Sequence, residues 1–223
     1  MNTVKFHLIF VASICSAVLL NADRHENVFS NIYHNAVWGK NAQGEGFSGG
    51  GSLLANCLEY NHFVEKFMRE HNIRSVVDAG CGDWESTRYI DWNGIDYFGC
   101  DVVESVINKN IKRFGSSNIH FEFGNLVTMD LPSADLLVCK HVLQHLPNED
   151  IKRFLPQLKK YKYCLIINEV YPHNLSSDNP DIQVGGGHKI DLRKAPFFID
   201  GTPVMNFRIG NAVHQIFLID NTK

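Results

Sequence analysis

Short apolar runs alternate with helix-like segments over residues 73–220, and this alternation is the feature that most constrains the fold. Strands are predicted where runs rich in β-branched and aromatic residues are bounded by glycine or polar residues. The order predicts an α/β protein with a doubly wound, mainly parallel sheet of seven strands and helices on both faces. The last two runs flank Gly210 and Asn211, which predicts a hairpin and one antiparallel strand at the sheet edge. The predicted strands are 73–80, 96–101, 119–125, 134–141, 162–170, 203–209 and 212–220, and the predicted helices are 53–72, 103–115 and 148–161, with Asn148 as the N-cap of the last.

The composition is ordinary for a globular protein and does not point to a nucleic-acid partner. The 223 residues are 44% hydrophobic and 20% charged, which suffices for one α/β domain with a full core. The formal net charge is -3, and the densest basic cluster is the short run 158–162. A generic nucleic-acid binder carries a clearer positive patch, so no nucleic-acid partner is indicated.

Residues 1–22 differ from the rest of the chain. One lysine precedes an apolar run from Phe6 to Leu20, and polar residues follow. The run is shorter than the ~20 residues that span a bilayer as a helix, and the pattern is typical of a secretory signal peptide cleaved after Ala22. The alternatives are a membrane anchor and a helix packed on the domain. We expect an exported or membrane-associated protein if the segment is a signal or an anchor, and a cytoplasmic one otherwise.

The remaining chain divides into a lead-in and a main domain. The polar lead-in 23–53 includes the sequence GGGS near its end, which forms either a plain linker or a lid over the cofactor, and the domain covers 54–223. The six cysteines include no CxxC pair and fall mostly in or beside predicted buried strands, which indicates reduced core thiols. His141 and His145 have the spacing of two metal ligands, but no third ligand lies near them, so no metal site is predicted.

The first predicted strand runs into the sequence VVDAGCGD, which predicts a ligand-binding turn. Ligands of doubly wound sheets bind beyond the carboxyl ends of the strands. A dinucleotide site needs a third glycine where this chain has Glu85, and the carboxylates of Glu85 and Asp83 would repel a pyrophosphate. S-adenosylmethionine carries a sulfonium and an amino group and no phosphate, so these acidic residues favour it. Asp101, which ends the second predicted strand, can accept hydrogen bonds from both ribose hydroxyls of either ligand.

Three successive segments, VVDAGCGD, YFGCDVV and DLLVCKHVLQHLPNEDI, resemble a class I S-adenosylmethionine-dependent methyltransferase of the broad type-11-like group. The glycine-rich segments on either side resemble a poorly characterised branch of that family. The resemblance implies a Rossmann-like methyltransferase fold with S-adenosyl-L-methionine as the cofactor, closed over by 50–52. It implies cofactor binding by Asp78, Gly80, Cys81, Gly82, Asp101, Val102, Asn125, Leu126 and Lys140.

Two positions depart from the family pattern. Trp84 stands where many relatives have a third glycine, so a large ring must fit at the exit of the turn. Asn125 stands where an acid is frequent, at the position that would flank the adenine.

The catalytic candidates follow from the chemistry of methyl transfer. A sulfonium methyl is already activated, so the enzyme mainly positions the acceptor in line, although an oxygen or nitrogen acceptor can need a general base. His141, at the end of the fourth predicted strand, is the best-placed base, and Glu169 is the second choice. The polar segment 171–197 is expected to shape the acceptor pocket. The substrate-binding candidates are Trp38, His173, His188 and Arg193.

Two functions remain open at this point. The first is a methyltransferase that acts on an unidentified small molecule or modified polymer end. The alternative is a non-catalytic binding protein of the same fold, exported or membrane-tethered, that keeps the cofactor cleft as a relic. The missing third glycine and the acidic turn argue against an NAD-type oxidoreductase. Family members methylate oxygen, nitrogen and carbon on unrelated substrates, so the fold does not identify the acceptor.

Overall fold

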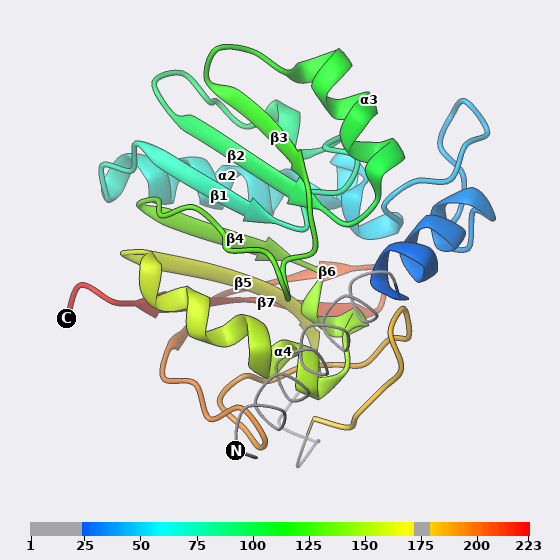
Figure 1. Ribbon diagram of the computed structural model, residues 1–223. Helices are drawn as coiled ribbons and strands as arrows, with labels where there is room; N and C mark the ends of the chain where they lie inside the picture. Colours follow the sequence, from blue (N-terminus) through cyan, green and yellow to red (C-terminus); the bar gives the residue numbers. More distant parts are fainter. Residues whose placement is uncertain (1–23, 172–178) are drawn as a thin grey trace, which may run out of the picture.

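Seven strands form one sheet in the computed structural model, which describes residues 24–171 and 179–223 (Figure 1). Their order across the sheet is β3-β2-β1-β4-β5-β7-β6. The strands β1 to β5 pair in parallel, whereas β7 is antiparallel to both of its neighbours, β5 and β6. The predicted antiparallel strand is therefore β7, which lies one place inside the edge. The bounds are β1 Ser75–Ala79, β2 Asp96–Asp101, β3 Ile119–Phe123, β4 Leu136–Lys140, β5 Tyr163–Val170, β6 Thr202–Ile209 and β7 Ala212–Asp220.

The strand order reverses between β1 and β4. From β1 the chain proceeds to β2 and β3 on one side, and then returns to β4 and β5 on the other. Loops that leave the carboxyl ends of β1 and β4 therefore run in opposite directions and leave a crevice between them, which is the usual ligand site of such sheets.

Helices cover both faces of the sheet, as predicted. Neighbouring residues of a strand point to opposite faces, and β1 shows this: Val76 packs in the same apolar cluster as Val64 of α2, and Val77 in the same cluster as Phe154 of α4. Figure 1 shows α4 in front of the sheet and α2 behind it. The helices are α2 Leu54–Glu70, α3 Glu104–Phe114 and α4 Asn148–Phe154.

The third predicted helix differs from expectation in two ways. Pro147 holds the N-cap position of α4, so Asn148 is its first helical residue and the predicted Asn148 cap is wrong. After Phe154 the chain continues as a 3-10 helix, Leu155–Lys160. Pro156 has no N–H to donate to the carbonyl four residues earlier, which accounts for the change of helix type.

Part of the lead-in is helical, which the sequence did not predict. Residues 24–34 form a helix whose Phe29 and Ile32 belong to the same apolar cluster as α4. This helix lies beside the carboxyl ends of the parallel strands (Figure 1). Residues 38–53, called the strap below, lead from it to α2. The predicted leader 1–22 lies outside the described residues.

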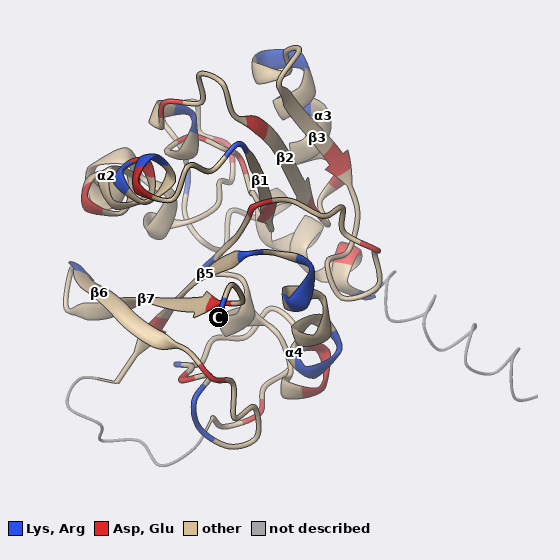
Figure 2. Cartoon of the chain, turned by 90° about the vertical axis from the view of Figure 1, so that its left-hand side faces the viewer, with Lys and Arg blue, Asp and Glu red and all other residues tan. Residues whose placement is uncertain are grey.

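Charges of both signs are interspersed on the helices. Both α2 and α4 carry basic and acidic residues, so neither helix has charge of a single sign (Figure 2). Within residues 24–171 and 179–223, no helix is long and apolar enough to cross a membrane.

Candidate active site

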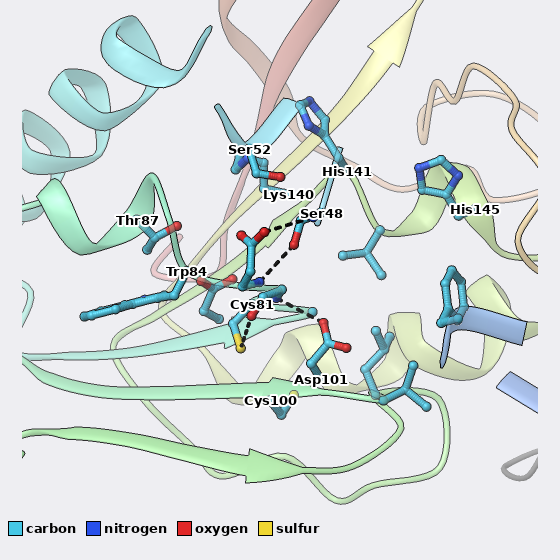
Figure 3. A pocket seen from close by; sticks show the side chains of 18 of the residues that line it. Ser48, Ser52, Cys81, Trp84, Thr87, Cys100, Asp101, Lys140, His141 and His145 are labelled. Atoms are coloured by element: carbon cyan, nitrogen blue, oxygen red, sulfur yellow. Dashed lines mark hydrogen bonds between the residues drawn. The ribbon is translucent and has the colours of Figure 1, made fainter. Parts of the chain in front are cut away.

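A cleft lies at the carboxyl ends of β1, β2 and β4, where the strand order reverses (Figure 3). Its empty volume, which includes open solvent at the mouth, is about 940 Å³. The 24–34 helix and the strap close one side of it. The predicted site residues that line the cleft are Trp38, Asp78, Gly80, Cys81, Gly82, Asp101, Val102, Asn125, Leu126, Lys140 and His141.

The turn after β1 needs its two glycines. Gly80 has a φ of 85° and Gly82 a φ of 56°, a region that side chains disfavour. A Cβ on Gly82 would lie 2.4 Å from the Ser48 hydroxyl oxygen. The turn is held by the N–H groups of Gly80 and Cys81, which both donate to the Cys100 carbonyl at 2.9 Å. The backbone of the turn is thus fixed. The absence of a Cβ leaves room for Val142 beside Gly80 and for Ser48 beside Gly82.

Two carboxyl groups flank the turn, of which Asp78 is buried and Asp101 is partly buried. The Tyr97 hydroxyl donates to Asp78 at 2.7 Å. Asp101 accepts from the N–H groups of Gly82 and Val103, both at 3.0 Å. Burial raises the pKa of Asp78 and of Asp101 to about 6 in each case. A ligand that offers hydroxyl or ammonium donors would stabilise the ionised form of both groups.

The exit of the turn leads into no α-helix. After β1 the chain forms tight turns and the short 3-10 helix Thr87–Tyr89 before it enters β2. Trp84, with a φ of 57°, points its ring into the core against Tyr97 and Phe121, at centroid distances of 5.3 and 5.2 Å. The large ring is accommodated because no helix fills this space. The turn therefore presents no helix N-terminus to a pyrophosphate, which is a further argument against a dinucleotide.

A protein-family comparison matches this same part of the chain. Residues 76–161, which run from β1 to the 3-10 helix after α4, match the family described as "Methyltransferase domain". The matched segment supplies the glycine turn, Asp101, Asn125, Lys140 and His141 to the cleft. This match supports the resemblance of the chain to class I S-adenosylmethionine-dependent methyltransferases.

Solved structures share the methyltransferase fold at low sequence identity. Magnesium protoporphyrin IX methyltransferase from Synechocystis PCC 6803, with SAH bound, is 14% identical with a TM-score of 0.53, over 72% of this chain and 81% of that one. Mitomycin 7-O-methyltransferase MmcR is 16% identical with a TM-score of 0.55, over 74% and 54%. The methyltransferase domain of bacterial CtHen1 is 15% identical with a TM-score of 0.52, over 72% and 98%. No curated protein sequence matches the chain.

Asn125 offers the methyltransferase cleft a free hydrogen-bond donor. Its Oδ1 accepts from the Val127 N–H at 3.0 Å. Its Nδ2 is buried and has no partner among the described residues. A buried amide without a partner is costly unless a ligand satisfies it. An adenine ring nitrogen is an acceptor of the required kind. Asparagine, which stands here in place of the frequent acid, can therefore hold the adenine by donating a hydrogen bond.

Lys140 places a cation in the lining of the cleft. Its ammonium group donates to the Gly51 carbonyl at 2.8 Å and lies 3.8 Å from the Cys57 sulfur. No carboxylate is within ion-pair distance of it among the described residues. An ammonium bonded only to neutral groups is suited to an anionic ligand group, such as the carboxylate of S-adenosylmethionine.

His141 lies beside Lys140 in a strained backbone conformation. Its φ is 58°, rare for a residue with a side chain, and its N–H donates to the Ile167 carbonyl at 2.8 Å. A Cβ on Gly51 of the strap would lie 2.5 Å from its Nδ1, so this position of the strap requires glycine. Burial lowers the pKa of His141 well below its usual value, with a smaller contribution from Lys140. The imidazole is therefore neutral near pH 7 and able to accept a proton.

Contacts between the strap and the glycine turn are a part of the site that the sequence did not reveal. The Ser48 N–H donates to Asp83 at 2.9 Å, and the Asp83 N–H donates to the Ser48 hydroxyl at the same distance. The Tyr33 hydroxyl and the Ser48 hydroxyl are 2.5 Å apart. Asp83 closes the predicted motif, but its partner Ser48 precedes it by 35 residues and has no motif of its own.

The remaining candidates lie in different places. Trp38 lines the cleft with its ring 5.0 Å from that of His145. Glu169 forms an ion pair with Lys189 at 3.1 Å and is outside the cleft lining. His188 and Arg193 are outside it too: His188 hydrogen-bonds to the Pro180 carbonyl, and Arg193 pairs with Asp191 at 2.8 Å. His173 lies outside the described residues.

Histidine and cysteine side chains form no metal site among the described residues. No group of three or more His, Cys, Asp or Glu side chains could hold an ion there. His145, the residue with metal-ligand spacing to His141, hydrogen-bonds to the Gly186 carbonyl at 2.6 Å. The five described cysteines are free and buried, which confirms that these are core thiols.

Proposed function

We propose that this protein transfers the methyl group of S-adenosylmethionine to an oxygen or nitrogen atom of a small molecule or a modified polymer end. The observation that supports this most directly is the convergence of Asp78, Asp101, Asn125, Lys140 and His141 on one cleft. These residues come from four separate segments of the chain. Their donors and acceptors match the amino-acid, ribose and adenine parts of that cofactor, and none of the matches requires a phosphate.

Each residue has a distinct role in this proposal. Asp101 accepts hydrogen bonds from the ribose hydroxyls through the lone pairs that Gly82 and Val103 leave free. Asn125 holds the adenine, and Lys140 pairs with the carboxylate of the amino-acid part. The bound cofactor supplies an activated methyl group, so the chain's own task is to orient the acceptor and exclude water.

His141 is the general base of the proposed reaction. It lines the cleft, is neutral near pH 7, lies against Gly51 of the strap, and has its backbone N–H bonded to Ile167 of β5. A histidine with a perturbed pKa in a cleft is a candidate functional group, and this supports the transferase over the non-catalytic alternative.

Titration calorimetry of the full-length chain with S-adenosylmethionine, S-adenosylhomocysteine and NAD tests the proposed cofactor. We expect affinities near micromolar for the two adenosyl compounds and no measurable heat with NAD. A folded sample that binds neither adenosyl compound would overturn the proposal. Transfer itself is tested by incubating the enzyme with methyl-labelled cofactor and cell extract, then searching by mass spectrometry for labelled small molecules and polymer ends.

The variant Lys140→Met tests how the amino-acid part is held. We expect it to weaken S-adenosylhomocysteine binding by about 10- to 100-fold, since a hydrogen bond to a charged group contributes about 1.5–3 kcal/mol. Binding of 5′-methylthioadenosine, which lacks the amino-acid part, is expected to stay within about twofold. Lys112→Met, at an exposed position of α3, is the matched control. Equal losses for both compounds would show that Lys140 does not recognise the carboxylate.

A further inference from the structure

A second histidine lies directly behind His141. His214 is on β7, and its ring centroid is 4.6 Å from that of His141 with an interplanar angle of 57°. The His214 side chain is buried and stacks on its other side against Phe207, at 5.5 Å. Nothing in the predicted motifs involves β7, and His214 does not line the cleft.

Each ring has one buried nitrogen without a partner. Among the described residues, Nε2 of His141 and Nδ1 of His214 make no hydrogen bond. A neutral imidazole carries one donor and one acceptor nitrogen, so the two unpaired atoms can complement each other as Nε2–H of His141 and the lone pair on Nδ1 of His214. The ring centroids are 4.6 Å apart, a separation at which ring nitrogens can reach hydrogen-bond distance of each other. The Nδ1 of His141 is then the nitrogen nearest Gly51 of the strap.

The surroundings of the pair favour a proton on the outer ring. His214 faces Glu169 in the register of β7 with β5, and this carboxylate acts to raise the pKa of His214, although burial lowers it overall. The other charged groups near His214 are Lys140 and Lys189. His141 instead faces Lys140, His214 and His145, which all lower its pKa in addition to burial. A proton placed on His141 is therefore less stable there than on His214.

We infer that His214 is a positioning residue that receives the proton of the methyl acceptor through His141 and passes it toward Glu169 at the protein surface. The inference rests on the proposed function. The acceptor atom forms a bond to the methyl carbon while the carbon–sulfur bond breaks and its electron pair goes to sulfur. The acceptor's proton moves to Nδ1 of His141, and the proton on Nε2 of His141 moves to Nδ1 of His214. Glu169 and its partner Lys189 are partly exposed, so the proton can leave from there to water.

The test is an NMR titration of the histidine imidazoles in the full-length protein, with His141 assigned from the signals lost in His141→Gln. His214→Phe keeps an aromatic ring against Phe207 but removes the proton acceptor. We expect the His141 pKa to fall by about one pH unit or more in this variant, and His214→Gln, which retains an acceptor, to restore part of it. If the two histidines did not share a proton, His214→Phe would only remove a like charge near His141, and the His141 pKa would stay unchanged or rise. Either result would overturn the inference.

Two further arms separate this inference from the proposed function. His120→Phe, at an exposed position of β3, is the control and should leave the His141 pKa unchanged. S-adenosylhomocysteine should bind His214→Phe and the parent protein equally well. If the parent protein binds no adenosyl compound, the proposed function fails, while the titration still decides whether the two histidines share a proton.

Discussion

Replacing Asp101 by asparagine is expected to weaken the binding of S-adenosylmethionine and S-adenosylhomocysteine by about 100-fold or more. The carboxylate accepts from Gly82 and Val103 and has lone pairs left for two ribose hydroxyls. Hydrogen bonds to a charged group contribute about 1.5–3 kcal/mol each, and two of them account for the expected loss. An asparagine presents a donor where one of these bonds needs an acceptor. Calorimetric titration of both compounds measures the effect.

The same substitution should change how the stability of the ligand-free protein depends on pH. Burial raises the Asp101 pKa to about 6 from the usual 3.8, so ionisation of this group costs folding free energy. The stability that Asp101 contributes is full below about pH 3.8 and is lost as the pH rises to about 6. The Tm of Asp101→Asn relative to that of the parent protein should therefore rise between about pH 4 and pH 6, as measured by scanning calorimetry at several pH values.

Asp96→Asn is the matched control for both measurements. Asp96 begins the same strand, β2, at the opposite end of the sheet, and is exposed. We expect it to change neither the affinity nor the pH dependence of Tm. If Asp101→Asn bound S-adenosylhomocysteine as tightly as the parent protein does, Asp101 would not hold the ribose and the orientation of the proposed cofactor would be wrong.

Gly80→Ala is expected to lower the free energy of unfolding by about 2–5 kcal/mol and to abolish cofactor binding. The φ of 85° is unfavourable for alanine, which costs about 1–2 kcal/mol. The new Cβ would lie 2.3 Å from Cγ2 of Val142, and overpacking of this kind costs about 1–3 kcal/mol more. Chemical denaturation measures the first effect and calorimetric titration the second.

A double variant separates the two causes of that loss. Val142→Ala removes the clashing methyl groups, so Gly80→Ala combined with Val142→Ala should recover the overpacking part and retain the cost of the positive φ. Gly187→Ala is the control, because its φ is not positive and a Cβ there has no atom within 4 Å. A Gly80→Ala protein as stable as Gly187→Ala would show that the turn does not need glycine at this position.

The methyltransferase motifs could be predicted because their signals are local. The run Val76–Val77 marks a buried strand by its β-branched residues, and Gly80 and Gly82 mark a turn with positive φ that few other residues adopt. The order of strands and helices then places Asp78 and Asp101 at one end of a parallel sheet. The cleft contains both, together with every other cofactor residue predicted from the motifs.

Other predictions from the sequence were limited by long-range contacts. The helix 24–34 was missed because its polar sequence shows no strong apolar face, and Phe29 and Ile32 are buried only by packing against the assembled domain. The Asn148 cap was wrong because Pro147 takes that position. The segment 171–197 was expected to shape the acceptor pocket, yet its His188 and Arg193 form their own contacts outside the cleft lining. Glu169, the second choice of general base, is also outside the lining and pairs with Lys189.

The sequence by itself thus determined the sheet, the glycine turn and the residues that line the cleft beyond β1, β2 and β4, because each depends on conformational preferences within a few residues and on the direction of parallel strands. Only the tertiary structure decided which residues cover and support these groups. Ser48 meets Asp83, and His214 meets His141, across long stretches of chain and between elements that no local pattern connects. Their pairing depends on how the strap and β7 pack against the completed sheet, which is set by burial of side chains from the whole domain.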